Sequence, residues 1–213
     1  HWRSPLEGAL RLMNFCWIDA LTRACDDAEL TAEQDEIAQA FVPAHAWWVW
    51  RKKSFGSSAN NHLMGELAAL VMVTKRWPSL AKLICCPERV WPLLEQETLR
   101  QFADDGGNKE QALHYHLFAW EMTWQAGRVM ERLHGPVMAR LRDAAQYFCD
   151  LSMGAWDFGD SDDAQITPLT MHREHSEREW KAWMLGTGEG ASLRFWLGDP
   201  PRESEEPQSE GRA

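Results

Sequence analysis

Apolar side chains recur at helical spacing along most of this chain, and short polar segments separate the runs. Over residues 6–21 they return every three or four positions, and Ser4-Pro5 before them is a typical helix start. Residues 31–34 have the pattern of a second helix start. The helix they predict continues to about residue 52, with a kink or break expected at Pro43.

The most apolar of the predicted helices covers residues 59–76. It is apolar almost all round between residues 63 and 73, which is typical of a buried helix. Further helices are predicted over residues 87–102, 108–133, 137–153 and 177–184. Nothing in the pattern indicates paired strands. The sequence therefore predicts an all-α fold of antiparallel helix hairpins joined by short turns.

Composition fits a globular protein with one sizeable core, because 45% of the 213 residues are hydrophobic and 25% are charged. We expect a helical domain over residues 1–185 and an irregular, acidic, disordered tail over residues 186–213. No apolar run reaches the roughly 20 residues that span a bilayer. The chain begins at His1 without a basic-then-apolar leader, so no signal peptide is predicted.

The net charge of −10 argues against a general nucleic-acid binder. An anionic substrate stays compatible with it, because Arg51-Lys52-Lys53 offers a local basic rim. The more common explanation for such a run is a solvated helix end, where cations complement the helix dipole.

The five cysteines are odd in number and include one vicinal pair, which is neither a zinc pattern nor a disulfide framework. Reduced or buried thiols are expected, with no metal or cofactor in this chain. Thirteen tryptophans are explained mainly by wide helix packing, with one or two available to line a sugar cleft. The expected core or interface tryptophans are most of Trp47, Trp48, Trp50, Trp120, Trp124, Trp180 and Trp183.

Two polar segments lead directly into apolar helices. The first places Asn61 and His62 in the first helical turn, with Glu66 one turn later on the same face. The second, residues 104–111, leads into Tyr115. We interpret the two junctions as one site, in which Asn61, His62 and Tyr115 face a common cleft.

Other kinds of site are disfavoured by spacing. His114 and His116 are two positions apart and point to different faces of a helix, which argues against a zinc site. Residues 157–163 resemble a calcium loop only superficially, because the liganding Glu is not in place. This loop is either a solvated turn or a segment that closes on the site. Phosphate-binding glycine loops and nucleophile elbows are absent from the sequence.

Three motifs occur in order: Asn60-Asn61-His62-Leu63-x-x-Glu66, Asp105-Gly106-x-x-x-Glu110-Gln111-x-x-x-Tyr115-His116, and Phe158-Gly159-Asp160-Ser161-Asp162-Asp163. Together they resemble the helical domain of heparinase II/III-type polysaccharide lyases, a family that includes alginate lyases. The resemblance covers about residues 2–185. It implies an incomplete (α/α) toroid, normally followed by a β-sandwich domain, that cleaves uronic-acid polysaccharides by β-elimination.

The resemblance also implies roles for individual residues. Asn61 and His62 match the residues that hold the uronate carboxylate and assist proton removal. Tyr115 matches the tyrosine that serves as acid, and in some members also as base. Supporting or substrate-binding roles are implied for Glu66, Gln111, His116, Asn60 and Asp160.

The implied partners are an acidic polysaccharide or oligosaccharide and either a missing β-sandwich domain or a second copy of the chain. Any zinc site would lie in that missing domain. The family's usual location is the bacterial periplasm or the outside of the cell. No membrane span and no nucleic-acid partner are expected.

The sequence thus predicts the catalytic toroid portion of a polysaccharide lyase. One alternative is a catalytically silent helical module that binds glycans or assembles with a second domain. Another is a glycoside hydrolase, which needs two carboxylates across the scissile bond. The available acids are Asp104, Asp105, Asp160 and Asp162.

Overall fold

The computed structural model is all-helical in the part of the chain that it describes, apart from one isolated bridge between Phe102 and Asn108. It describes residues 4–57, 59–151, 159–160, 166, 173–187 and 191–201, with backbone alone for 173–178 and 191–192. The elements are α1 (Pro5–Ala24), α2 (Ala28–Lys52), α3 (Asn61–Arg76), the 3-10 helix η1 (Pro78–Lys82), α4 (Pro87–Gln101), α5 (Leu113–Val129), α6 (Pro136–Leu151), α7 (Arg173–Leu185) and α8 (Ala191–Leu197).

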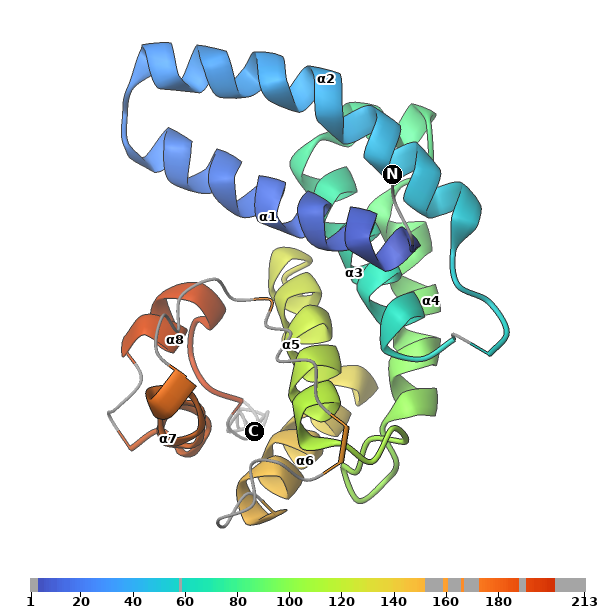
Figure 1. Ribbon diagram of the computed structural model, residues 1–213, viewed down its shortest axis with the longest axis vertical. Helices are drawn as coiled ribbons and strands as arrows, with labels where there is room; N and C mark the ends of the chain where they lie inside the picture. The colour runs from blue at the N-terminus through green and yellow to red at the C-terminus, as the bar shows by residue number, and fades with distance from the viewer. Residues whose placement is uncertain are drawn as a thin grey trace, which may run out of the picture.

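Helix α3 is the centre of the packing. Every residue from Leu63 to Thr74 is buried, and the helix contacts α1, α2, α4 and α5. Gly65 lets its neighbours come close, because a Cβ there would lie 2.6 Å from Leu6 of α1 and from Met122 of α5. In Figure 1 the α1–α2 hairpin lies along the top, α4 lies on the right, and α7 and α8 lie at the lower left. The predicted buried helix is confirmed.

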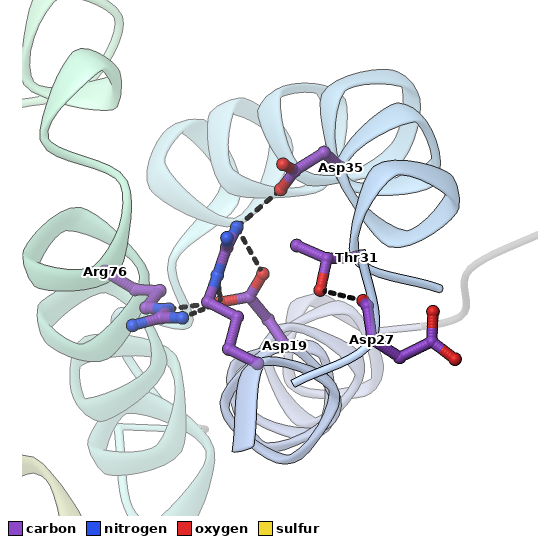
Figure 2. A network of polar contacts seen from close by, with 6 residues as sticks. Asp19, Asp27, Thr31, Asp35 and Arg76 are labelled. Carbon is purple, nitrogen blue, oxygen red and sulfur yellow. Dashed lines mark hydrogen bonds and ion pairs between the residues drawn. The ribbon is translucent and has the colours of Figure 1, made fainter. Parts of the chain in front are cut away.

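The C-terminal end of α3 is tied to the α1–α2 hairpin by charge (Figure 2). Asp19 of α1 is completely buried and pairs with Arg76 of α3 and with Arg23 one turn along α1. Arg23 also reaches Asp35 of α2, with 2.5 Å between Nη2 and Oδ1. Asp19 therefore joins α1 to α3, and Arg23 extends the network to α2.

The C-terminal helices dock on α5 through tryptophans. Trp120 and Trp124 of α5 stack 5.1 Å apart, and both meet Trp183 of α7 edge to face. The indole N–H of Trp124 donates to Leu197 O, 2.9 Å away. Four of the tryptophans expected in the core are buried, namely Trp120, Trp124, Trp180 and Trp183. Trp47, in contrast, is 47% exposed.

Helices α2 and α5 have bounds that differ from the prediction. Helix α2 begins at Ala28, where Asp27 accepts from two backbone N–H groups, so Thr31 lies inside the helix. It also continues through Pro43 without a break. Helix α5 begins only at Leu113 and ends at Val129, shorter than the predicted 108–133.

The segment from residue 186 onward is not irregular throughout. It contains α8, whose Leu193, Trp196 and Leu197 are buried, and Trp196 meets Trp17 of α1 edge to face. The prediction of disorder for residues 202–213 lies outside the described residues. None of the helices in the described ranges is long and apolar enough to cross a membrane.

Candidate functional site

The N-terminus of α3 carries three of the predicted site residues, Asn60, Asn61 and His62. Asn60 is the N-cap, and its side-chain oxygen accepts from the backbone N–H of His62 at 3.2 Å. Asn61 is buried and His62 is half-buried, both in the first turn as predicted. The amino end of a helix has unsatisfied N–H groups and positive potential, so this is a place where an anion is stabilised.

The second junction is a tight turn held against α6. Ala103 N donates to Gly107 O at 2.8 Å, and Asp105 accepts from Gly107 N at 2.9 Å. Arg140 of α6 binds both Phe102 O and Asp104. Gly106 has φ +86°, and a Cβ there would lie 2.4 Å from a carbonyl oxygen of α6, so only glycine fits.

Glu110 brings the two junctions together. Its Oε1 accepts from the backbone N–H of Asn61 at 3.0 Å, and its Oε2 accepts from Asn61 Nδ2 at 2.9 Å. Asn60 Nδ2 also reaches Oε2, at 3.5 Å. The turn before α5 therefore lies against the mouth of α3. Glu110 belongs to the motif that carries the resemblance, but no separate role was predicted for it.

Tyr115 lies in the first turn of α5, five residues after Glu110, and is half-buried. The contact through Glu110 brings its helix start to the mouth of α3, as the interpretation of one site requires. That the phenol, Asn61 and His62 face one cleft stays a prediction.

Gln111 lies outside the helix that was predicted to contain it. Its φ is +52°, and α5 begins two residues later, so Gln111 and Tyr115 do not share a helical face. The reason is local: the Asn108 side chain accepts from Glu110 N at 2.9 Å and holds a turn where a helix start was expected. Gly159 packs here too, because a Cβ on it would lie 2.7 Å from Gln111 O.

Asp160 is exposed beside Gly159. The rest of the acidic loop that it belongs to, residues 157–158 and 161–163, lies outside the described residues. The supporting role of Asp160 stays a prediction.

Glu66 binds the loop that precedes α3. Both carboxylate oxygens accept from Ser54, one from its backbone N–H and one from its hydroxyl, each at 2.6 Å. Burial raises the pKa of Glu66, while the Ser54 bonds and nearby Lys53 oppose the shift. Lys53 itself turns back over the Trp50 ring, 3.4 Å from its centroid. Of the predicted basic rim, Arg51 and Lys52 remain exposed in the last turn of α2.

His116 is a buried, neutral histidine. Its Nε2 lies 2.8 Å from the carbonyl oxygen of Ala144, which can only accept, so the ring donates from Nε2. Phe102 and Phe148 pack around it, and Tyr147 stacks on it with 5.8 Å between ring centroids. Burial lowers the pKa of His116 to about 4.

Acid should destabilise the protein through His116. The unfolded histidine keeps its ordinary pKa near 6.5, so the stabilising contribution is complete above that pH and is lost as the pH falls toward 4. We expect a loss of about 3 kcal/mol in the free energy of unfolding from this group. Urea unfolding between pH 7 and 4 measures it, and His116→Gln should flatten the slope. The raised pKa of Glu66 makes this group increase stability as the pH falls, and it does so equally in the wild type and in His116→Gln. Equal slopes would refute the assignment.

Glu110→Gln should weaken the contact between the junctions. The amide keeps the shape of the carboxylate but loses its charge, and its nitrogen cannot accept from Asn61. We expect a loss of about 1–2 kcal/mol in unfolding free energy, measured by urea denaturation. The matched control is Glu36→Gln, an exposed glutamate on α2, expected to change stability by less than about 0.5 kcal/mol. Similar losses in the two variants would show that the contact contributes nothing.

Two of the four acids available for hydrolysis are engaged in structural contacts. Asp104 pairs with Arg140, and Asp105 closes its own turn by accepting from Gly107 N. Asp162 lies outside the described residues. Within the described ranges, no three His, Cys, Asp or Glu side chains gather as metal ligands would.

A cleft of about 310 Å³ opens beside the mouth of α3. The loop after α2 contributes Phe55, which is 72% exposed, while α3 contributes Leu63 and α4 contributes Arg100. Arg100 donates to Ala59 O at 3.0 Å and to Glu97 at 2.8 Å. Sequence reasoning missed this cleft, because Phe55 and Arg100 are far apart along the chain.

Comparison with models of known protein families, with curated proteins and with solved structures found no match.

Proposed function

We propose that this chain is the helical portion of a polysaccharide lyase that cleaves a uronic-acid polysaccharide by β-elimination. The observation that carries the proposal is the contact between the α3 N-terminus and the turn before α5, made by Glu110 on Asn61. The contact brings the helix that carries the amide and the imidazole to the start of the helix that carries the phenol.

The chemistry needs charge to be dispersed on the substrate carboxylate. Removing the proton next to a uronate builds a second negative charge, which hydrogen-bond donors such as an amide or an imidazolium stabilise. Asn61 and His62 supply these groups at a helix N-terminus, where the backbone adds positive potential. Tyr115 takes the proton or donates one to the leaving glycosidic oxygen as the carbon–oxygen bond breaks and the carbon–carbon double bond forms.

The cleft between the Phe55 loop and α4 suits a polymer chain. Phe55 exposes an aromatic ring on the loop side of the cleft, and Arg100 of α4 also lines it. Sugar rings have apolar faces that pack on aromatic rings, and a uronate pairs with a guanidinium. The substrate in this proposal therefore passes the mouth of α3 along that cleft.

We further propose that the helix hairpins form part of an (α/α) toroid and that the complete enzyme contains a second domain. The two consecutive helix hairpins in Figure 1, α1 with α2 and α3 with α4, support this.

A glycan-binding module without turnover is the second candidate. Glu110 already occupies both the backbone N–H and the Nδ2 of Asn61, so a substrate carboxylate must displace another carboxylate to reach them. If Glu110 stays bound to Asn61, the protein would bind a glycan along the cleft without promoting proton removal from it.

Incubation of the full chain with alginate, heparan sulfate and related polymers tests the two candidates. A rise in ultraviolet absorbance from the unsaturated uronate reports elimination directly. Cleavage without that absorbance would indicate hydrolysis and refute the lyase proposal. Binding without any product would favour the silent module.

A further inference from the structure

A second pocket lies at the Asn108–Gln111 turn, between the start of α5 and the end of α6. Its volume is about 210 Å³, below the roughly 300 Å³ at which pockets hold drug-sized ligands. Ala112, Leu113 and Leu151 form the apolar part of its lining. Asn108, Gln111 and Tyr147 contribute the polar part, together with His116.

Asn108 lines this pocket and has an unused donor among the described residues. The residue is only 7% exposed, and its Oδ1 is occupied by Glu110 N. Its Nδ2 is buried without a hydrogen-bond partner among the described residues. A buried amide nitrogen without a partner is costly, about 1–3 kcal/mol, so an acceptor supplied by a ligand would stabilise it.

Gln111 is held in a conformation that glutamine rarely adopts. Its φ is +52°, as in a left-handed helix. The other described non-glycine residues with positive φ are Asp26 and Glu131, and each follows the C-cap of a helix, where this conformation is routine. Gln111 instead precedes α5. Glycine would fit here without strain, whereas glutamine brings a side chain with hydrogen-bond donors and an acceptor to the lining of the pocket.

We propose that this pocket binds one neutral sugar ring or a polyol of that size. Hydroxyl and ring oxygens accept from Asn108 Nδ2 and exchange hydrogen bonds with Gln111 and Tyr147, while the apolar face of the ring packs on Leu113 and Leu151. The described lining residues carry no charge at neutral pH, so nothing in the lining compensates an anion. The pocket is therefore distinct in chemistry from the α3 mouth, where the N-terminus favours a carboxylate.

The pocket and the α3 mouth share one turn. Asn108 touches the pocket on one side and accepts from Glu110 N on the other, and Glu110 in turn binds Asn61. A sugar held in the pocket would thus lie next to the proposed elimination site. The pocket does not depend on that proposal, because it requires only neutral binding.

The two tyrosines of the chain allow the two sites to be read separately. The sequence contains two tyrosines, Tyr115 and Tyr147, so labelling with fluorotyrosine gives two fluorine resonances. The resonance that disappears in Tyr147→Phe belongs to Tyr147. Titration with glucose, mannose and glycerol should shift the Tyr147 resonance in a saturable way. Inorganic phosphate should leave it unchanged. A uronate at the α3 mouth should affect Tyr115, so failure of one proposal is distinguishable from failure of the other.

Gln111→Gly is the decisive variant. It relieves the strained φ and removes the side chain, so we expect an unchanged or raised melting temperature together with at least a tenfold rise in Kd for the neutral ligand. Lys109→Ala, an exposed residue of the same turn that does not line the pocket, should keep the wild-type Kd. The inference is overturned if no neutral ligand shifts Tyr147, if phosphate shifts it equally, or if Gln111→Gly binds as tightly as the wild type.

Discussion

Replacing Arg76 by methionine should lower the free energy of unfolding by about 3 kcal/mol, because it strands a buried charge. Asp19 is fully buried and, among the described residues, would keep only Arg23 as an ion-pair partner, which is 41% exposed and shared with Asp35. The loss should appear as a lower urea midpoint at pH 7 with an unchanged slope, since the compactness of the folded state does not change.

Three matched variants separate this buried pair from ordinary surface charge. Lys75→Met alters the neighbouring exposed cation of α3, and Asp35→Ala removes the exposed end of the network; each should change stability by about 1 kcal/mol or less. Adding Asp19→Leu to Arg76→Met removes the stranded carboxylate and should recover part of the loss. If Arg76→Met and Lys75→Met lowered the free energy of unfolding by the same amount, the ion pair between Asp19 and Arg76 in Figure 2 would not stabilise the packing of α3 on the hairpin.

The sequence predicted the central helix well because its pattern leaves little choice. A run that is apolar on every face has to be buried, and Asn60 before it is a strong capping residue. The observed start of α3 lies within two residues of the predicted start. Asn61 and His62 therefore lie in the first turn, as predicted.

The second junction was harder to predict because side chains there compete with the helix. Asn108 binds Glu110 N and closes a turn, so the same residue that looked like a helix cap delays α5 to Leu113. A similar competition shifted the start of α2, because Asp27 caps the helix four residues before Thr31, the predicted cap. Local spacing does not decide between two capping residues so close together.

The contact between the junctions could be expected only as a hypothesis. Glu110 and Asn61 are 49 positions apart, and their meeting depends on how α3 packs against α5. Helix α8 also depends on a contact distant in the sequence, because its Trp196 packs on Trp17 of α1. Local sequence in residues 191–197 carries no sign of that partner.

Under the proposed lyase function, Tyr115→Phe should reduce turnover of a uronate polymer by roughly a hundredfold or more, the usual contribution of a positioned acid or base. The change removes one oxygen atom from a half-buried ring, so the melting temperature should stay near that of the wild type. Initial rates of unsaturated-uronate formation measure the loss. His62→Ala should lower the rate as well, and His134→Ala, an exposed histidine between α5 and α6, is its matched control.

Tyr115 is a cleaner test of the site than Asn61. Asn61 donates twice to Glu110, so any substitution there also loosens the contact between α3 and the turn before α5. Lost turnover in an Asn61 variant would therefore mix catalysis with positioning. A rate lost in Tyr115→Phe at unchanged stability assigns proton transfer to the phenol. A variant that keeps the full rate would place the acid elsewhere and end the assignment of a shared cleft.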